Sequence, residues 1–188
     1  MIDTLIENIK KKSNLTLDET EQLFDKIFNG EVDTSSLTSL LDALDKKGET
    51  PDELAGATTS MRKNSKSIDV NHNQVIDCCG TGGLGKKMIN VSTSVSFVLA
   101  AAGLKVAKHG NRTSTGRSGS ADFLEAAGIN LNKSSEYFSD ALDQIGLGFL
   151  FAQNHHPGMK YVMEARKILG KKTIFNLLGP LSNPAGAN

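Results

Sequence analysis

A glycine-rich segment near the middle of the chain constrains the fold more than any other feature. Residues 77–93 read Asp-Cys-Cys-Gly-Thr-Gly-Gly-Leu-Gly-Lys-Lys-Met-Ile-Asn-Val-Ser-Thr, directly after an apolar run. Glycine tolerates a positive φ and has no side chain to hold a ligand away, so successive backbone N–H groups can turn inward around an anion. The segment therefore favours a phosphate-binding loop, with a candidate nest formed by Gly80, Gly82, Gly83 and Gly85.

Three phosphate-binding patterns overlap on this segment, and its surroundings separate them only in part. Gly80-x-Gly82-x-x-Gly85 fits the dinucleotide fingerprint, but that motif needs an acidic residue roughly 20 positions further on, where the chain has lysines. The same glycines nearly fit the P-loop, but Lys87 stands where a Ser or Thr would reach magnesium. The glycines alone leave the nucleotide class open, and a purely structural turn is an alternative.

The first 64 residues carry the signals of several short amphipathic helices. Thr16, with a glutamate three residues later, predicts a capping box, and Gly30 predicts the end of that helix. Gly48 predicts a second end, and Thr50 followed by Pro51 predicts a new start. Apolar side chains at helical spacing give two of these helices a face that needs a partner, either the rest of the chain or another subunit. They are Leu23, Phe24, Ile27, Phe28, Leu37, Leu40, Leu41 and Leu44.

The chain changes character beyond residue 70, where 15 of its 18 glycines lie. Strand and helix signals alternate there, which is typical of a parallel sheet with helices on both faces. Strands are predicted at 74–79, 104–108 and 148–152, and helices at 92–102, 118–127, 134–145 and 157–169. Ligands of such sheets bind beyond the carboxyl ends of the strands, where the glycine loop, 108–111 and 153–156 fall.

The domain organisation follows from this change. We predict an α/β protein with a small N-terminal helical domain over residues 1–68 and part of a parallel-sheet α/β domain over 69–188. A polar stretch over 61–73 is suited to a linker between them.

Charge and composition bound the class of partner. The formal net charge is zero, but residues 1–60 carry 13 Asp and Glu against 6 Lys and Arg, and residues 61–188 carry 8 against 15. A positive second part fits the steering of a polyphosphate, although two solvated surfaces explain it equally well. The basic residues are scattered, with eight Phe, two Tyr and no Trp to stack bases, which argues against a nucleic-acid partner.

The two cysteines and the apolar stretches carry no further site. Cys78 and Cys79 are adjacent, so they form no disulfide framework, and a zinc site would need more ligands at suitable spacing. We expect two buried thiols that close a strand. No apolar stretch reaches the roughly 18 residues needed to cross a bilayer, and the N-terminus lacks the apolar core of a signal peptide. We expect a cytoplasmic protein with no membrane partner.

Motifs along the whole chain resemble those of the anthranilate phosphoribosyltransferase family, in that family's order. Besides the glycine segment they are Gly48–Gly56, Lys108-His109-Gly110-Asn111-Arg112, Ser118–Asp122, Phe149–Ala152, His156-Pro157, Arg166 and Phe175–Pro184. Pyrimidine nucleoside phosphorylases share the fold and a glycine-rich loop, but the Lys-His-Gly-Asn and Leu-Gly-Pro-Leu strings favour the anthranilate family. The resemblance implies transfer of the ribosyl group of phosphoribosyl pyrophosphate to the amino nitrogen of anthranilate, with release of pyrophosphate, in tryptophan biosynthesis.

The resemblance also implies residues for the phosphates. Such a transfer needs no protein nucleophile, so no catalytic residue is assigned, and the enzyme acts by positioning and charge compensation. Mg²⁺ is the implied cofactor, with Ser92 as its ligand. Plain helix capping is the alternative role for 90–93, and a surface position is the alternative for Lys108. The implied phosphoribosyl pyrophosphate residues are Gly80, Gly83, Leu84, Met88, Asn90, Val91, Ser92, Thr93, Lys108, His109, Gly110, Asn111 and Ser120.

A second set of residues is implied for anthranilate. Arg166 offers a planar fork that matches a carboxylate, and the alternative is a solvated arginine on a helix. His156 is assigned to the site, whereas His155 is expected to be structural. The implied anthranilate residues are Gly80, Asn111, His156, Arg166, Gly179 and Pro180, the last two forming a turn.

Two departures and the length shape the remaining expectations. Leu84 stands where the family has an acidic residue and Met88 where it has threonine, so weaker metal and phosphate binding is expected. The chain is shorter than the family's usual length, and we expect a fragment that pairs as a homodimer through its N-terminal helices. The 188 residues alone are expected to show no detectable turnover. A nucleoside phosphorylase and a non-catalytic dimerising fragment are the alternative functions.

Overall fold

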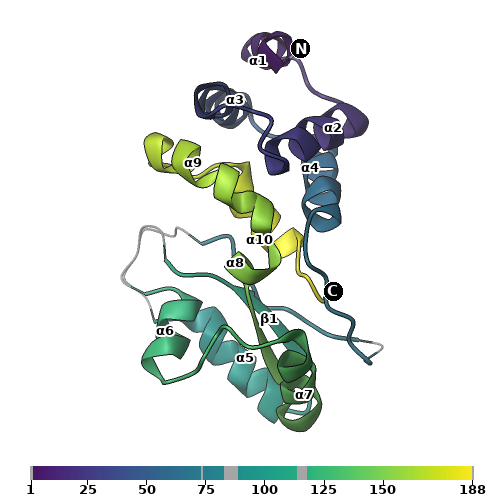
Figure 1. Cartoon of the computed structure of the whole chain (residues 1–188), viewed down its shortest axis with the longest axis vertical. Helices are drawn as coiled ribbons and strands as arrows, with labels where there is room; N and C mark the ends of the chain where they lie inside the picture. Colours follow the sequence, from purple (N-terminus) through teal and green to yellow (C-terminus); the bar gives the residue numbers. More distant parts are fainter. Residues whose placement is uncertain (1, 73, 83–88, 114–117, 188) are drawn as a thin grey trace. The chain divides into compact units, whose positions relative to one another are not determined.

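Helices make up one part of this chain, and a small parallel sheet organises the other. The computed structural model describes residues 2–72, 74–82, 89–113 and 118–187. It divides into a helical unit, formed by Met1–Ser65 with His156–Ser182, and an α/β unit, formed by Lys66–His155 with Asn183–Asn188. Figure 1 shows the elements of each unit. The helical unit therefore draws on two separate stretches of the chain, and the division predicted between 68 and 69 stays a prediction.

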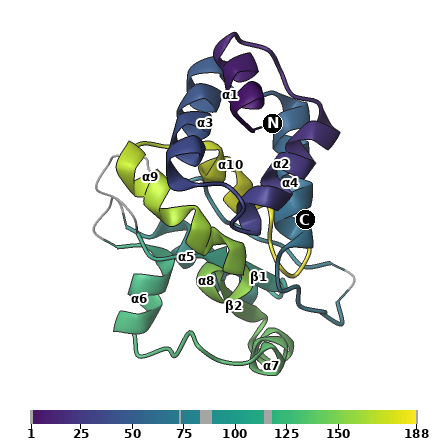
Figure 2. The ribbon, with the colours of Figure 1, turned by 45° about the horizontal axis from the view of Figure 1, so that its top comes forward.

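The helical unit contains six α-helices and one 3₁₀-helix among the described residues. In Figure 2, α1 lies beside α3, and α2 lies beside α4. The capping boxes predicted at Thr16 and Thr50 are both present, and Gly30 and Gly48 follow α2 and α3 with φ values of 77° and 85°. The elements are α1 (Ile2–Lys10), α2 (Leu17–Phe28), α3 (Thr34–Lys47), α4 (Pro51–Lys63), η1 (Pro157–Tyr161), α9 (Met163–Leu169) and α10 (Ile174–Leu181).

The apolar faces of α2 and α3 are buried within this unit. All eight of the predicted apolar side chains, from Leu23 to Leu44, belong to one core together with residues of η1, α9 and α10, among them Val162, Phe175 and Leu178. Phe24, Phe28 and Phe175 pack ring against ring, with centroids 5.7 to 6.1 Å apart. Of the two partners considered for these faces, the rest of the chain is the one found, because residues 156–182 cover them.

Three local predictions in this unit are corrected. The helix α4 extends to Lys63, so the first part of the predicted linker is helical. The single helix predicted over 157–169 is a 3₁₀ turn followed by α9. Gly179 and Pro180 lie inside α10 rather than in a turn. Pro180 has no N–H, so α10 lacks the hydrogen bond that residue 180 would otherwise donate to the carbonyl of Asn176.

The α/β unit is built on two parallel strands. The strand β1 (Val106–Gly110) pairs with β2 (Leu147–Phe151), with Val106 opposite Leu147 and Gly110 opposite Phe151. The strand predicted over 74–79 is reduced to one bridge, in which Ile76 pairs with β1 through the amide of Ala107. The helices are α5 (Val91–Ala101), α6 (Ser120–Ala126), α7 (Ser135–Ile145) and α8 (Ala152–His155).

Helices cover both faces of this sheet. Successive residues of β2 point to opposite faces, and each face meets a different helix. Gly148 faces α7, since a Cβ on it would lie 2.3 Å from the ring of Phe138, and Leu150 belongs to the same cluster. Phe149 and Phe151 point to the opposite face, where they pack with Ala121 and Leu124 of α6. The predicted fold class, a helical domain followed by an α/β domain with a parallel sheet and helices, is confirmed. Among the described residues, no helix is long and apolar enough to cross a membrane.

Candidate functional site

The described part of the glycine loop has room for a ligand. Gly82 has a φ of +69°, a conformation that favours glycine, and a Cβ added at Gly80 would meet no atom within 4 Å. Both residues are exposed. The predicted site residues Gly83, Leu84 and Met88 lie outside the described residues.

Four predicted residues stand at the start of α5. The Asn90 side chain does not cap this helix; its Nδ2 donates to the Ser118 hydroxyl and to the Gly119 carbonyl, both at 3.1 Å. Val91 is exposed, and Ser92 is partly buried with no hydrogen bond from its hydroxyl among the described residues. Thr93 is buried, and its Oγ1 has no partner in the described part of the chain. Plain capping therefore fails to explain these hydroxyls, which stand where the N–H groups of a helix attract an anion.

Lys108 is a buried lysine near the end of β1. Its exposed fraction is 2 %, and its Nζ donates to the carbonyl of the next residue, His109, at 2.9 Å. No carboxylate lies within salt-bridge distance of this ammonium among the described residues. An ammonium carries three donors, and burying a charge without a counter-ion is costly. Lys108 therefore has donors to offer an anion, and the surface position considered for it is wrong.

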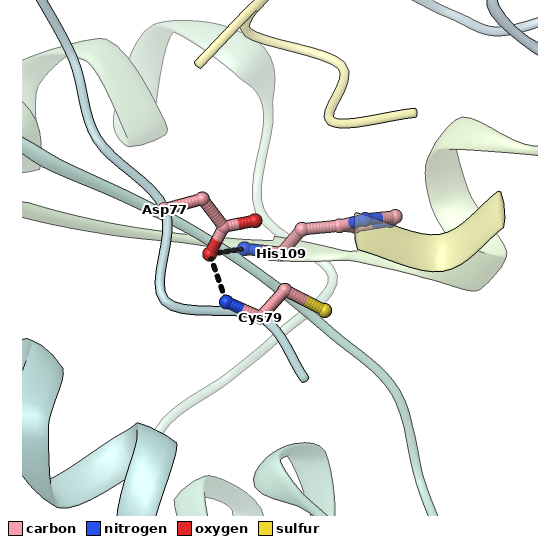
Figure 3. Close-up of side chains that lie close together, drawn as sticks. All are labelled: Asp77, Cys79 and His109. Carbon is pink, nitrogen blue, oxygen red and sulfur yellow. Dashed lines mark hydrogen bonds between the residues drawn. The ribbon is translucent and has the colours of Figure 1, made fainter. Parts of the chain in front are cut away.

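Asp77, Cys79 and His109 lie close together at the base of the loop (Figure 3). One atom of each could face a metal ion, and these three atoms lie within 4.8 Å of one another. Both Asp77 oxygens already accept hydrogen bonds, from the amides of Cys79 and His109 and from the side chain of Asn183. We interpret the three residues as a hydrogen-bonded hub.

Three further predicted residues surround the end of β1. Gly110 is required for close approach, because a Cβ there would lie 2.8 Å from the Phe149 ring and 3.0 Å from the Cβ of Ser120. Asn111 Oδ1 accepts from the amide of Arg112 at 2.8 Å, and its carbonyl accepts from the amide of Ala121 at 3.2 Å. The end of β1 is thereby joined to the start of α6, which brings Ser120 close to Gly110.

Arg112 is committed to a structural pair. Its guanidinium donates to both oxygens of Glu125, at 2.6 and 3.1 Å, and lies 4.7 Å from the centre of the Phe151 ring. Asp122 accepts from the amides of Thr113 and Gly119, which brings both ends of this loop to one carboxylate. The basic residue next to the Lys-His-Gly-Asn string is thus held by its own unit.

The helical unit holds the remaining anthranilate candidates. Arg166 is partly buried on α9, where burial lowers its pKa, and its Nη2 donates to Asn176 Oδ1 at 3.4 Å. No carboxylate pairs with it within the described residues. Asn176 lies on α10 three residues before Gly179 and four before Pro180, so the three residues share one face of that helix. His156 is buried directly before η1. Gly80 and Asn111 belong to the α/β unit.

His155 has a structural position. Its Nδ1 lies 3.0 Å from the carbonyl of Lys66, whose amide in turn donates to the His155 carbonyl at 2.8 Å. Burial lowers the pKa of this histidine, so the neutral ring is favoured, with Nδ1 as the donor. The structural role expected for His155 fits this geometry.

Two polar residues of this region, Asp77 and Asn183, were not assigned any role from the sequence. The signal was present at Asp77, an acidic residue between an apolar run and the first glycine. Asn183 lies in the Phe175–Pro184 motif, but its role could not be inferred there, because its partners lie far away in the sequence.

Comparisons with known proteins match both parts of the chain. Residues 3–65 match the helical bundle domain of a glycosyl transferase family, and residues 72–188 match its α/β domain. The chain is 46 % identical over 188 residues to anthranilate phosphoribosyltransferase from Desulfatibacillum aliphaticivorans, covering 100 % of this chain and 56 % of that protein. The chain thus spans little more than half the length of such curated relatives.

Comparison with solved structures also matches the chain to anthranilate phosphoribosyltransferases. A crystal structure of anthranilate phosphoribosyltransferase from Thermus thermophilus matches 97 % of this chain and 56 % of its own, with a TM-score of 0.91 and 42 % identity. The enzyme from Saccharomyces cerevisiae, in complex with PRPP and Mg, matches with a TM-score of 0.84 and 28 % identity, over 97 % of this chain and 56 % of that one. A variant of the yeast enzyme in complex with 4-fluoroanthranilate has a TM-score of 0.79 at 27 % identity, over 98 % and 55 % of the two chains.

Proposed function

Since this chain belongs to the glycosyl transferase family, we propose that it is the N-terminal part of an anthranilate phosphoribosyltransferase of tryptophan biosynthesis. That enzyme transfers the ribosyl group of phosphoribosyl pyrophosphate to the amino nitrogen of anthranilate and releases pyrophosphate. The observation that carries the proposal is Lys108, a buried ammonium with one backbone acceptor among the described residues. A polyanion is the ligand that such a group lacks.

The phosphate side of the site is proposed around Lys108. The loop at Gly80 and Gly82 supplies backbone N–H groups, and the start of α5 supplies the Ser92 and Thr93 hydroxyls at the positive end of a helix dipole. Gly83, Leu84 and Met88 remain sequence-based members of this set, as do Val91, His109 and Ser120. Asn90 is proposed to act indirectly, because its amide already ties the start of α5 to Ser118 and Gly119.

In the proposed transfer reaction, the main task of the protein is to position the reactants. The bond between the ribose C1 and the pyrophosphate oxygen breaks, the anthranilate nitrogen bonds to C1, and this nitrogen releases a proton. Fixed positive groups stabilise the departing pyrophosphate, and an in-line amine replaces it. This agrees with the absence of any assigned nucleophile.

Mg²⁺ is proposed as the cofactor, and the chain offers Ser92 to it. The hydroxyl of Ser92 makes no hydrogen bond among the described residues, so its oxygen could hold a hard cation. Bound Mg²⁺ supplies neutralisation of the diphosphate charge. A Leu84→Asp variant is expected to strengthen binding of phosphoribosyl pyrophosphate at millimolar Mg²⁺ but not without Mg²⁺. Calorimetry with and without the metal measures this, and an equal effect in both would remove position 84 from the metal site.

Arg166 is proposed to bind the anthranilate carboxylate. Among the described residues, this partly buried guanidinium hydrogen-bonds only through Nη2, to Asn176, and lies 5.9 Å from the centre of the Phe175 ring, so it retains donors for a bidentate contact. Gly80, Asn111, His156, Gly179 and Pro180 complete the proposed anthranilate set. Arg166→Lys is expected to raise the Michaelis constant for anthranilate at least about tenfold more than that for phosphoribosyl pyrophosphate, because the fork is lost and the charge is kept. Equal effects on both constants would remove Arg166 from the site.

The decisive experiment follows anthranilate fluorescence in the natural gene product that contains this chain. With phosphoribosyl pyrophosphate and Mg²⁺, the fluorescence is expected to fall as anthranilate is consumed. Lys108→Met is expected to weaken phosphoribosyl pyrophosphate binding, whereas Lys133→Met removes the same charge from an exposed position and leaves it unchanged. Phosphorolysis of a pyrimidine nucleoside with no use of anthranilate would overturn the proposal in favour of a nucleoside phosphorylase.

Pairing of two copies through the helical unit, and a cytoplasmic location, belong to the same proposal. The faces at 23–28 and 37–44 no longer support the pairing, since they are buried within the unit. Apolar side chains that remain exposed in this unit include Met163 and Ile168 of α9. Light scattering at tens of micromolar is expected to give the dimer mass. A monomer mass for wild type would remove the dimer from the proposal, and a monomer produced only by Ile168→Glu would place α9 at the interface.

A further inference from the structure

Asp77 joins three separate segments of the α/β unit through one carboxylate. Its Oδ1 accepts the amide N–H of Cys79 at 3.0 Å and the amide N–H of His109 at 3.2 Å, the two dashed contacts of Figure 3. Its Oδ2 accepts the Nδ2 of Asn183 at 2.8 Å. The start of the glycine loop, the end of β1 and the turn after α10 therefore meet at one side chain.

Asn183 completes the connection with its whole amide group. Its Nδ2 also donates to the carbonyl of Ala107 in β1 at 2.8 Å, and its Oδ1 accepts the amide of Ala185 at 2.8 Å. The Asn183 side chain is buried, and its bonds to Ala107 and Ala185 are buried as well, whereas the bond to Asp77 is partly buried. We call this pair the Asp77–Asn183 clamp.

The clamp fixes the two groups that the proposed function uses. The amide of Cys79 sets the orientation of the Cys78–Cys79 peptide, directly before Gly80, and the amide of His109 sets the orientation of the Lys108–His109 peptide. Both amides are held by the same oxygen, so the loop and the buried ammonium share one reference point. The carboxylate itself would repel a phosphate, but its two oxygens are turned toward three N–H donors instead.

We propose that the Asp77–Asn183 clamp is a positioning element for the diphosphate, holding the glycine loop in register with Lys108. The inference rests on the proposed function. Fixed placement of charge-compensating groups is where such a transfer gains its rate, and small displacements have large effects. Asp77 touches no reacting atom and acts through the two amides it holds.

The test measures binding of phosphoribosyl pyrophosphate with Mg²⁺ by calorimetry on the natural protein that contains this chain. Asp77→Asn keeps the shape and leaves one oxygen for the two amides, but it turns an NH₂ toward the NH₂ of Asn183, so the clamp opens. We expect affinity for phosphoribosyl pyrophosphate to fall by about ten- to a hundredfold. The Michaelis constant for anthranilate is expected to change far less.

A double variant and a stability control separate positioning from folding. Asp77→Asn with Asn183→Asp restores a donor opposite an acceptor between the two side chains but loses the bond to the Ala107 carbonyl, so it is expected to regain only part of the affinity. Phe138→Leu weakens the core of the same unit without touching the clamp, so it is expected to lower the unfolding midpoint and leave affinity unchanged. Equal loss of affinity in Phe138→Leu and Asp77→Asn, at equal loss of stability, would overturn the inference.

Failure of the inference and failure of the function are distinct results. If wild type binds phosphoribosyl pyrophosphate and Asp77→Asn binds it equally well, the clamp does not position the loop and the proposed function stands. If wild type does not bind it, both fall. Hydrogen exchange gives a ligand-free readout: the amides of Cys79 and His109 are expected to exchange faster in Asp77→Asn, and unchanged protection of both would refute the clamp.

Discussion

The side chains of Lys47 and Lys108 are both buried, but their surroundings differ. Lys47, in the helical unit, has a side chain only 4 % exposed, and its Nζ donates to Glu53 at 2.8 Å, to the carbonyl of Gly48 at 2.8 Å and to Asn14 at 3.1 Å. Lys108, in the α/β unit, has a single backbone acceptor and no carboxylate among the described residues. One ammonium has its three donors used, and the other does not.

The difference separates a structural charge from a candidate binding group. Glu53 is equally committed, since it also accepts the amides of Leu15 and Thr50. The pair thus joins the loop after α1, the end of α3 and the start of α4 in a network with few unmet hydrogen bonds. A buried charge with too few partners in the protein destabilises the fold. Such a charge therefore indicates a site where a ligand of opposite charge binds.

The largest expected effect is on the saturated pair. Lys47→Met leaves the Glu53 carboxylate buried without its counter-ion and is expected to lower the free energy of unfolding by about 3 kcal/mol. Chemical denaturation of the purified protein measures it. Lys46→Met, at the exposed neighbouring position, is the matched control and should change stability much less. A loss no larger than that of the control would mean that Lys47 is not structural, and the comparison would fail.

The second prediction is that a substitution of Lys108 lowers ligand affinity rather than stability. Lys108→Met removes a charge-assisted contact to the ligand and is expected to weaken pyrophosphate or phosphoribosyl pyrophosphate binding by roughly ten- to a hundredfold. The unfolding midpoint is expected to stay the same or rise, because no buried carboxylate is left behind. A destabilisation as large as that of Lys47→Met, with affinity retained, would show that Lys108 belongs to the same class as Lys47.

A third effect concerns pH and sharpens the account of Glu53. Burial alone would raise the pKa of this carboxyl, but the hydrogen bonds from Leu15, Lys47 and Thr50 outweigh it and lower the pKa below the ordinary 4.5. The charged network is therefore expected to stabilise the fold fully above that value and to lose its contribution as the pH falls below it. The difference in stability between wild type and Glu53→Gln should shrink between pH 5 and pH 3. A constant difference would place the stabilising charge elsewhere.

The smallest effect is expected at an exposed ion pair. Arg112 and Glu125 are both substantially exposed, so Arg112→Gln should alter stability little and change phosphoribosyl pyrophosphate affinity by less than about twofold. Binding assays beside Lys108→Met test this directly. A large loss of affinity would mean that Arg112 leaves Glu125 to reach the ligand.

Prediction from sequence worked best where the signal is local. Thr16 and Thr50 begin helices because a hydroxyl and a glutamate three residues later satisfy backbone N–H groups within one turn. The bounds predicted for β1 and β2 differ by at most two residues from those in the structure, because the sequence signals of a strand are also local. The α10 helix was missed because Gly179-Pro180 indicates a turn, whereas burial of Ile174, Phe175 and Leu178 in the helical core favours the helix.

The sequence did not show which residues far apart in the chain contact one another. The amphipathic faces of α2 and α3 were visible as patterns, but that residues 156–182 cover them depends on the path of the chain back to the helical unit. Lys108 was singled out by its motif, yet its burial and its single acceptor among the described residues are properties of the packed strand. Asp77 and Asn183 are 106 positions apart, and only folding joins them.

The helix caps, the glycine loop, the alternation of strands and helices and the family resemblance could be predicted from the sequence, because each depends on residues that are close together or in a fixed order. Folding brings together the pairs of buried charges, the apolar faces and their cover, and the carboxylate and the amides that it holds. Those contacts depend on distance in space, which sequence spacing does not encode.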